Sequence, residues 1–136
     1  MSIKEIYQTM EYGPAPESNK ESVAFLDQHK RKFQLFINGK WTKPSSGEYF
    51  ESISPSTTEK LAQVAEANDK DVDDAVKAAK KAHKPWVELG GHGRARYLYA
   101  IARQIQKHSR NFAVLESMDN GKPIRETRDI DIPLVA

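Results

Sequence analysis

Residues 114–123 read Val-Leu-Glu-Ser-Met-Asp-Asn-Gly-Lys-Pro, and this stretch marks the end of one helix and the start of the next. Glycine after the last helical residue can adopt the left-handed conformation that satisfies the final carbonyl groups, so Asn120-Gly121 predicts a helix end. Proline is favoured at the first helical position because it has no N–H to leave unpaired. Pro123 therefore predicts the start of a further helix.

Two longer helices are predicted upstream of this stretch. Asn68 is a suitable N-cap, and apolar residues follow it at steps of three and four, namely Val72, Ala75, Val76, Ala79 and Ala82. Pro85 predicts the end of this helix, and Gly-Gly-His-Gly at 90–93 predicts a joint. A second apolar stripe bends or restarts near His108-Ser109 and consists of Ala95, Leu98, Ala102, Ile105, Phe112 and Leu115.

The first half of the chain predicts short strands. Residues 33–37 are rich in β-forming side chains and lead into Asn38-Gly39, a dipeptide that accepts the positive φ angles of a tight hairpin turn. After a turn at residues 45–47, alternating patterns at 49–53 and 61–67 predict further strands and a small antiparallel sheet. Strands come first and helices second, without strand-helix-strand alternation, so the visible fold class is α+β.

Residues 1–32 predict an N-terminal arm with two short helices, separated by Gly-Pro-Ala-Pro at 13–16. Ser18 and Glu21 have the spacing of a capping box, which predicts the second arm helix over about 19–30. Residues 33–136 then form one domain. No repeat interrupts this order.

The composition excludes several classes of function. The chain has no cysteine, which excludes a disulfide framework, a thiolate metal site and a cysteine nucleophile within these 136 residues. Basic and acidic residues are interspersed and leave a net charge of +2, which argues against a nucleic-acid or anionic-membrane surface. No apolar run approaches the roughly 20 residues that span a bilayer. The first residues lack the apolar core of a secretory signal, so we expect a cytoplasmic protein.

Several sequence segments occur in the order found in a known enzyme family. They are residues 35–41, 54–57, 64–67, 71–79, 94–96 and 114–123. From about Phe33 to its end the sequence resembles the aldehyde dehydrogenase superfamily, and residues 12–18 resemble the class that carries two such modules in one chain. The resemblance implies that residues 33–136 are the N-terminal part of the family's α/β fold and belong to its split Rossmann-like cofactor-binding domain.

The resemblance also implies a chemistry. In the family a cysteine thiolate attacks an aldehyde, an oxyanion site holds the intermediate, hydride passes to NAD or NADP, and a Glu activates water. Those residues lie downstream of the matched region, so we assign no catalytic and no cofactor-binding residue to this chain. Family members are several times longer, and residues 134–136 carry no helix stop. We therefore expect a fragment that ends inside a helix and is inactive alone.

Two pairs of residues are candidate site residues through the resemblance. In some family members the Asp that matches Asp119, with backbone carbonyls near the residue that matches Ile53, holds a monovalent cation, and such oxygens suit a hard ion. The alternative is that Asp119 only hydrogen-bonds nearby backbone and fixes the helix end. Ile132 and Leu134 match the helix that passes the aldehyde entrance, and ordinary helix packing is their alternative role.

Other candidate sites have simpler explanations. Residues 90–93 lack the Gly-x-Gly-x-x-Gly spacing and a preceding strand, so a helix-helix turn explains them better than a phosphate site. The acidic residues at 69–74 lack the glycine and distal Glu of a calcium loop and suit a helix N-terminus. Trp41 and Trp86 are expected to anchor the hairpin and the helices. The four histidines lie too far apart in the sequence to suggest zinc, at positions 29, 83, 92 and 108.

The sequence therefore supports two functional hypotheses. The leading one is the N-terminal part of an NAD(P)-dependent aldehyde dehydrogenase, with a small aldehyde as the parent protein's substrate and a homo-oligomer as its assembly. The other is a non-catalytic, aldehyde dehydrogenase-like protein with a structural or interaction role. The reading frame that follows residue 136 distinguishes them, because only the enzyme continues into a glycine-rich cofactor turn and a nucleophilic cysteine.

Overall fold

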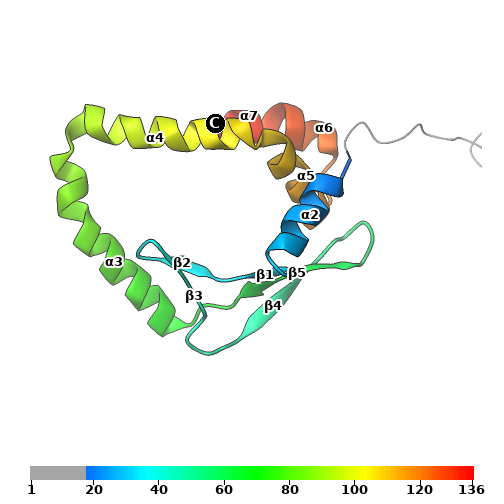
Figure 1. Cartoon of the computed structure of the whole chain (residues 1–136), viewed down its shortest axis with the longest axis horizontal. Helices are drawn as coiled ribbons and strands as arrows, with labels where there is room; N and C mark the ends of the chain where they lie inside the picture. Colours follow the sequence, from blue (N-terminus) through cyan, green and yellow to red (C-terminus); the bar gives the residue numbers. More distant parts are fainter. Residues whose placement is uncertain (1–17) are drawn as a thin grey trace, which may run out of the picture.

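The computed structural model describes residues 18–136 of the chain. The first arm helix and the Gly-Pro-Ala-Pro linker at 13–16 were predicted outside these residues. In Figure 1 the strands lie along the lower side, the longest helix rises away from them, and the next helix returns across the top. The elements are α2 (Lys20–Gln28), β1 (Lys32–Phe33), β2 (Leu35–Ile37), β3 (Lys40–Thr42), β4 (Tyr49–Ile53), β5 (Lys60–Ala65), α3 (Asp69–Glu88), α4 (Gly90–Lys107), α5 (Ser109–Asn120), α6 (Ile124–Glu126), the π-helix η1 (Thr127–Asp131) and α7 (Ile132–Val135).

The strands form two small sheets. The first has the order β1-β5-β4, and the second is the β2-β3 hairpin. The predicted antiparallel pairing is right for β4 with β5 and for the hairpin, but it is wrong for β1, because Phe33 pairs with Val64 in a parallel register. The predicted strand over 33–37 is divided at Gln34, so Phe33 joins one sheet while Leu35 begins the other.

The hairpin follows its local sequence. Asn38 and Gly39 have φ angles of 53° and 74°, the two positive values that a type I′ turn needs. The strands pair in register, with Phe36 opposite Trp41, and these two rings lie 5.0 Å apart between centroids. Trp41 therefore anchors the hairpin as predicted.

The start of α3 is a reciprocal cap. The side chain of Asn68 accepts from the Asp71 N–H at 3.2 Å, and Asp71 Oδ2 accepts from the Asn68 N–H at 3.2 Å. The Asp71 carboxylate also accepts from the Ser45 N–H, with both oxygens at 3.1 Å. Asp71 is buried, and it thereby ties the turn between β3 and β4 to the beginning of α3.

Two predicted helix boundaries are wrong. Helix α3 continues through Pro85 to Glu88. A proline in a helix interior destabilises the helix by about 3 kcal/mol. Trp86 packs against Tyr97 of α4, with ring centroids 5.6 Å apart, and this contact stabilises the end of α3. Pro123 precedes the next helix, because its ψ of 132° is extended and Ile124 is the first helical residue.

The capping box predicted at Ser18 and Glu21 is also not formed. Asn19 is the residue that precedes α2, and its side chain makes no cap hydrogen bond. The Ser18 hydroxyl instead accepts from the Lys20 N–H at 3.3 Å. The cap is therefore one residue later than the spacing predicted, although the helix itself lies within the expected range.

The other helix boundaries agree with the sequence. Helix α4 ends at Lys107 and α5 begins at Ser109, so the restart near His108 is confirmed. Helix α5 ends at Asn120, and Gly121 has the left-handed φ of 76° predicted for the stop. The Gly121 N–H donates to the Ser117 carbonyl at 3.0 Å, which completes the last turn.

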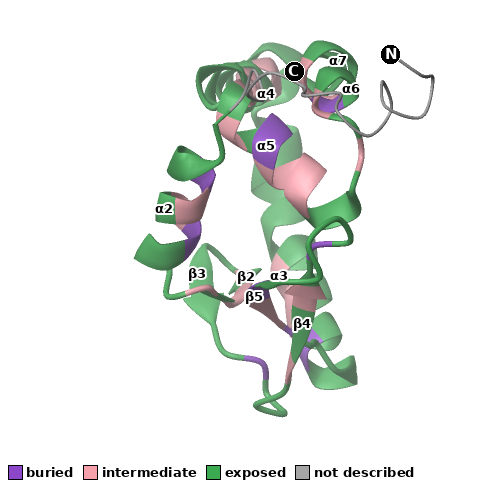
Figure 2. Ribbon diagram, turned by 90° about the vertical axis from the view of Figure 1, so that its right-hand side faces the viewer, coloured by how far each residue is buried: buried purple, intermediate pink, exposed green. Residues whose placement is uncertain are grey.

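The buried core lies where α2, β5 and α5 meet. Leu26, Leu61 and Ala62 form its centre. Partly buried side chains surround this centre, namely Phe25, Phe33, Leu115 and Met118. In Figure 2 the buried segments lie mainly on α2, α5 and the strands, whereas α3 and α4 are largely exposed. The sheet-and-helix core confirms the α+β class, and the apolar stripes of the two long helices remain mostly uncovered.

Candidate functional site

The two chain segments expected to share a cation site lie together in the structure. Ser52, next to Ile53 on β4, donates a hydrogen bond from its hydroxyl to Oδ1 of Asp119 in the last turn of α5. The regular pairing of β4 with β5 is interrupted between Ser52 and Ile53. The hydrogen-bond partner of Asp119 is thus a β4 side chain and not the backbone of its own helix end.

The helix stop is pressed against the turn that follows β4. A Cβ built at Gly121 would lie 2.8 Å from Cγ of Pro55, which is closer than real Cβ contacts. Glycine is therefore required here for two reasons, the positive φ and the close approach of the proline ring. Beyond it, the Lys122 N–H donates to Oδ1 of Asn120 at 2.7 Å. These contacts hold the C-terminal end of α5, and with it Asp119, against the end of β4.

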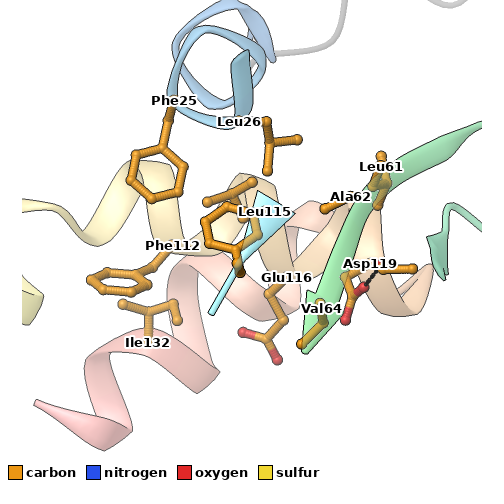
Figure 3. A pocket seen from close by; sticks show the side chains of 12 residues that line it. Phe25, Leu26, Leu61, Ala62, Val64, Phe112, Leu115, Glu116, Asp119 and Ile132 are labelled. Atoms are coloured by element: carbon orange, nitrogen blue, oxygen red, sulfur yellow. Dashed lines mark hydrogen bonds between the residues drawn. The ribbon is translucent and has the colours of Figure 1, made fainter. Parts of the chain in front are cut away.

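An apolar pocket of about 410 Å³ opens beside the Ser52–Asp119 contact. Figure 3 shows that its walls come from α2, β5, α5 and α7. The lining residues are Phe25, Leu26, Phe33, Ser52, Leu61, Ala62, Val64, Phe112, Leu115, Glu116, Asp119 and Ile132. Its polar groups are two carboxylates and the Ser52 hydroxyl, so the pocket is apolar with one acidic end.

The two candidate entrance residues occupy different environments. Ile132, the first residue of α7, lines the apolar pocket. Leu134 is 83% exposed and lies outside the pocket lining. The two side chains therefore do not line one common cavity among the residues that the structure describes.

Sequence reasoning missed a buried polar cluster around Thr127. This side chain is fully buried, and Oγ1 lies 3.0 Å from the Ala113 carbonyl oxygen and 3.1 Å from that of Ile124. The Ser117 hydroxyl lies 3.1 Å away. The cluster attaches the start of η1 to α5, and its only sequence signal is one threonine between charged residues.

A second missed contact joins α2 to α5. Ser22 is 1% exposed, and its hydroxyl donates to Oδ1 of Asn111 at 2.7 Å. The two residues are far apart in the sequence, and neither belongs to a recognisable motif.

An ion pair lies near the C-terminal side of the site. The Lys122 ammonium group contacts Oδ2 of Asp131, which connects the helix stop to η1. Hydrogen bonding to Asp131 holds the pKa of Lys122 above its ordinary value, although desolvation acts in the opposite direction. Both side chains are partly accessible, so the pair is at the margin of the site.

The joint between the helices was predicted over residues 90–93, but it is shorter, because only Leu89 separates α3 from α4 and the glycine-rich stretch forms the first turn of α4. Gly90 has a left-handed φ of 68° at this corner. A dinucleotide cradle needs a strand before the glycines, so these residues do not fit the pyrophosphate of NAD. Within residues 18–136 no three His, Asp or Glu side chains gather in a metal-binding arrangement. No helix of the described part has the length and apolar character to cross a membrane.

His29 has an ordinary packing role. Its Nδ1 lies 2.8 Å from the Phe25 carbonyl oxygen, and its ring stacks on Phe33 with centroids 5.6 Å apart. Trp86, in the helix corner, contacts Tyr97 as expected for a helix anchor.

Comparison with known proteins identifies the family. Residues 41–136 match the family model of the aldehyde dehydrogenase family. Aldehyde dehydrogenase B of Escherichia coli K12 is 38% identical over 121 residues, which cover 89% of this chain and 24% of that protein. Acetaldehyde dehydrogenase 2 of Cupriavidus necator is 41% identical over 106 residues, which cover 78% of this chain and 21% of that protein.

Solved structures give the same result. The NAD+ complex of an aldehyde dehydrogenase from Bacillus cereus superimposes with a TM-score of 0.77 at 39% identity, over 86% of this chain and 24% of that one. PnpE in complex with nicotinamide adenine dinucleotide gives a TM-score of 0.71 at 38% identity, over 74% of this chain and 21% of that one. The chain thus spans about a quarter of the length of its relatives. It belongs to the aldehyde dehydrogenase family.

Proposed function

We propose that this chain is the N-terminal portion of an NAD(P)-dependent aldehyde dehydrogenase that oxidises an aldehyde to a carboxylic acid. The match of residues 41–136 to the family is the observation that carries this proposal. The relatives' names and the two NAD complexes support the choice of substrate and cofactor. Residues 33–136 would form the N-terminal part of the cofactor-binding domain, with residues 1–32 as an arm.

The chain by itself would be inactive. It contains no cysteine that could attack the aldehyde, and its glycine-rich segment at 90–93 follows a helix and not a strand. When bound in the longer protein, NAD or NADP would accept the hydride. The residues that hold the cofactor and the aldehyde would lie in the three quarters of the relatives that this chain does not match. The cytoplasmic location and the homo-oligomeric state remain predictions.

The contribution of this portion would be a cation site next to the apolar pocket. We assign the Asp119 carboxylate and the Ile53 carbonyl to a monovalent cation, because carboxylate and carbonyl oxygens suit hard ions. The contact between Ser52 and Asp119 supports this assignment, since it brings the carboxylate to the strand position next to Ile53.

Ile132 and Leu134 would contribute to the aldehyde entrance. The support is stronger for Ile132, which borders the apolar pocket. Leu134 has a largely exposed side chain that later sequence could cover.

The test compares the 136-residue chain with the longest protein that the gene encodes. Aldehyde-dependent NAD(P)H formation is expected for the longer protein only. Turnover by the short chain above a heat-killed control would contradict its proposed inactivity. A longer protein that folds and has no turnover with a panel of aliphatic and aromatic aldehydes would favour the non-catalytic alternative.

A further inference from the structure

The segment that precedes the matched family region is firmly attached to the rest of the fold. The family match begins at residue 41, whereas α2 and β1 lie before it. Leu26 of α2 is 5% exposed and packs with Leu61 and Ala62 of β5. The Gln63 N–H donates to the Arg31 carbonyl at 2.8 Å, and β1 extends the sheet beside β5. This segment therefore contributes to the core.

Helix α5 is held at both of its ends by different parts of the chain. In its first turn, Asn111 accepts the hydrogen bond from the buried hydroxyl of Ser22. In its last turn, Asp119 accepts the hydrogen bond from Ser52. The two attachment points are about 12 Å apart along the helix axis at 1.5 Å per residue. Between them, Leu115 and Met118 pack on the core that Leu26 helps to form.

An α-helix of this length moves as a stiff body, because its hydrogen bonds link each turn to the next. A change of position at Asn111 is therefore transmitted to Asp119. The shift of the helix is largest if the group bonded to Asn111 is buried. A buried polar group that loses its hydrogen-bond partner is costly, so the helix moves until that group finds another partner or reaches water. Ser22 satisfies this condition.

We propose that α2 is a brace for α5 and that Ser22 is a positioning residue for the Asp119 carboxylate, acting through Asn111. The part that concerns a bound cation rests on the proposed function, whereas the mechanical part does not. Ser22 is not one of the residues that line the pocket, and its hydroxyl bonds to Asn111 and not to Asp119. Its effect on the site is indirect and requires the α5 helix to be intact.

The chain offers a matched control for this proposal. The Ser45 hydroxyl donates to Oδ1 of Asn68 at 2.8 Å, which is also a serine-to-asparagine hydrogen bond. It joins the turn between β3 and β4 to the start of α3, and Figure 1 shows these segments away from α5. Ser22→Ala and Ser45→Ala each remove one serine hydroxyl that is bonded to an asparagine, although Ser45 is exposed and its hydroxyl also bonds to the Asp71 carboxylate. A change at the end of α5 in Ser22→Ala that Ser45→Ala does not share therefore reports on the attachment of α2 to α5.

The first measurement is hydrogen exchange of the amides at 117–123 in the longest protein that the gene encodes. The Gly121 N–H, which bonds to the Ser117 carbonyl, reports on the last turn of α5. Ser22→Ala and Asn111→Ala are each expected to speed this exchange about five-fold over Ser45→Ala, and the double variant should be no faster than either. Equal exchange in Ser22→Ala and Ser45→Ala, or a change confined to the first turn of α5, would overturn the brace. Asn111→Ala keeps the test decisive if Ser22→Ala does not fold.

The second measurement separates the brace from the cation site. The melting temperature is titrated with KCl against N-methyl-D-glucamine chloride for the wild type, Ser22→Ala, Ser45→Ala and Asp119→Asn. If the cation site exists, potassium stabilises the wild type but not Asp119→Asn, and Ser22→Ala needs several-fold more potassium than Ser45→Ala for half of the effect. No potassium effect in the wild type overturns the cation site, and hydrogen exchange then decides on the brace alone. Equal potassium requirements in the two serine variants overturn the positioning role of Ser22.

Discussion

Ser52 and Asp119 are 67 positions apart in the sequence, and their side chains form a hydrogen bond that joins β4 to the last turn of α5. Asp119 is exposed to solvent and Ser52 is half-buried, so the contact by itself adds little stability. The packing around it is much tighter, because Gly121 lies directly against Pro55. The geometry of this corner therefore depends on the glycine more than on the hydrogen bond.

The first prediction concerns Gly121→Ala. A methyl group at this position meets the Pro55 ring at 2.8 Å and forces an unfavourable positive φ, so we expect a loss of about 2–4 kcal/mol in the free energy of unfolding. Gly47→Ala is the control, since Gly47 has a φ of 79° and no atom within 4 Å of the added Cβ. Urea denaturation measures both variants. Equal losses would mean that the Pro55 contact has no energetic role.

The second prediction concerns acid stability through Asp71. Burial alone would raise the pKa of Asp71, but hydrogen bonds from the Asn68 and Ser45 N–H groups and the Ser45 hydroxyl hold it below its ordinary value of 3.8. A depressed folded-state pKa contributes stability above the unfolded-state pKa, and this contribution is lost as the pH falls through the folded-state value. Asp71→Asn should therefore lower stability at neutral pH and flatten its decline in acid.

Urea midpoints measured from about pH 2 to pH 7 test this second prediction. Asp73→Asn, an exposed position on the same helix, is the control and should keep the wild-type slope. A wild-type slope in Asp71→Asn would show that other carboxylates dominate the acid transition.

The third prediction concerns the hairpin turn. Gly39 has a φ of 74°, which a β-branched residue adopts only with strain, so Gly39→Val should cost on the order of 1–3 kcal/mol. The turn lies away from the Ser52–Asp119 contact, and kcat per folded active site in the longer protein should be unchanged. Thermal denaturation and active-site-normalised kinetics measure the two quantities. A large loss of kcat at normal stability would contradict a purely structural role.

The fourth prediction concerns self-association of the 136-residue chain. Apolar side chains on α3 and α4 are uncovered, including Val72, Val76, Leu98 and Ile101. We expect the sedimentation coefficient to rise with protein concentration, because association would bury these surfaces. Leu98→Lys should weaken the association, whereas Lys80→Ala, a change at an exposed polar position, should not. A cooperatively melting monomer at every concentration would contradict this expectation.

The sequence predicted those parts of the fold that depend on local chemistry. Asn68 begins α3, Asn38-Gly39 forms the hairpin turn, and Gly121 ends α5, because each acts on the backbone within a few residues. Pro85 was misread as a helix end, since contacts between α3 and α4 decide whether a proline is tolerated. The parallel pairing of β1 likewise depends on where the chain returns after β4.

The site was only partly predictable for the same reason. Asp119 and Ile53 were named through the family resemblance, and nothing in the local pattern identified Ser52 as the partner. The contact of Ser22 with Asn111 and the burial of Thr127 both follow from packing between segments distant in the sequence. Such polar contacts have no periodicity, so a single sequence gives no signal for them.

The π-helical turn at η1 holds one residue more than an α-helical turn would. Deleting one residue between Thr127 and Asp131 would let this turn become α-helical and leave the direction of α7 nearly unchanged, so Ile132 would still border the apolar pocket. The same deletion within the regular helix α5 would rotate every later side chain of that helix by about 100°. The π-helical segment is consequently the place where relatives could differ in length by one residue and keep the same helix faces on either side of it.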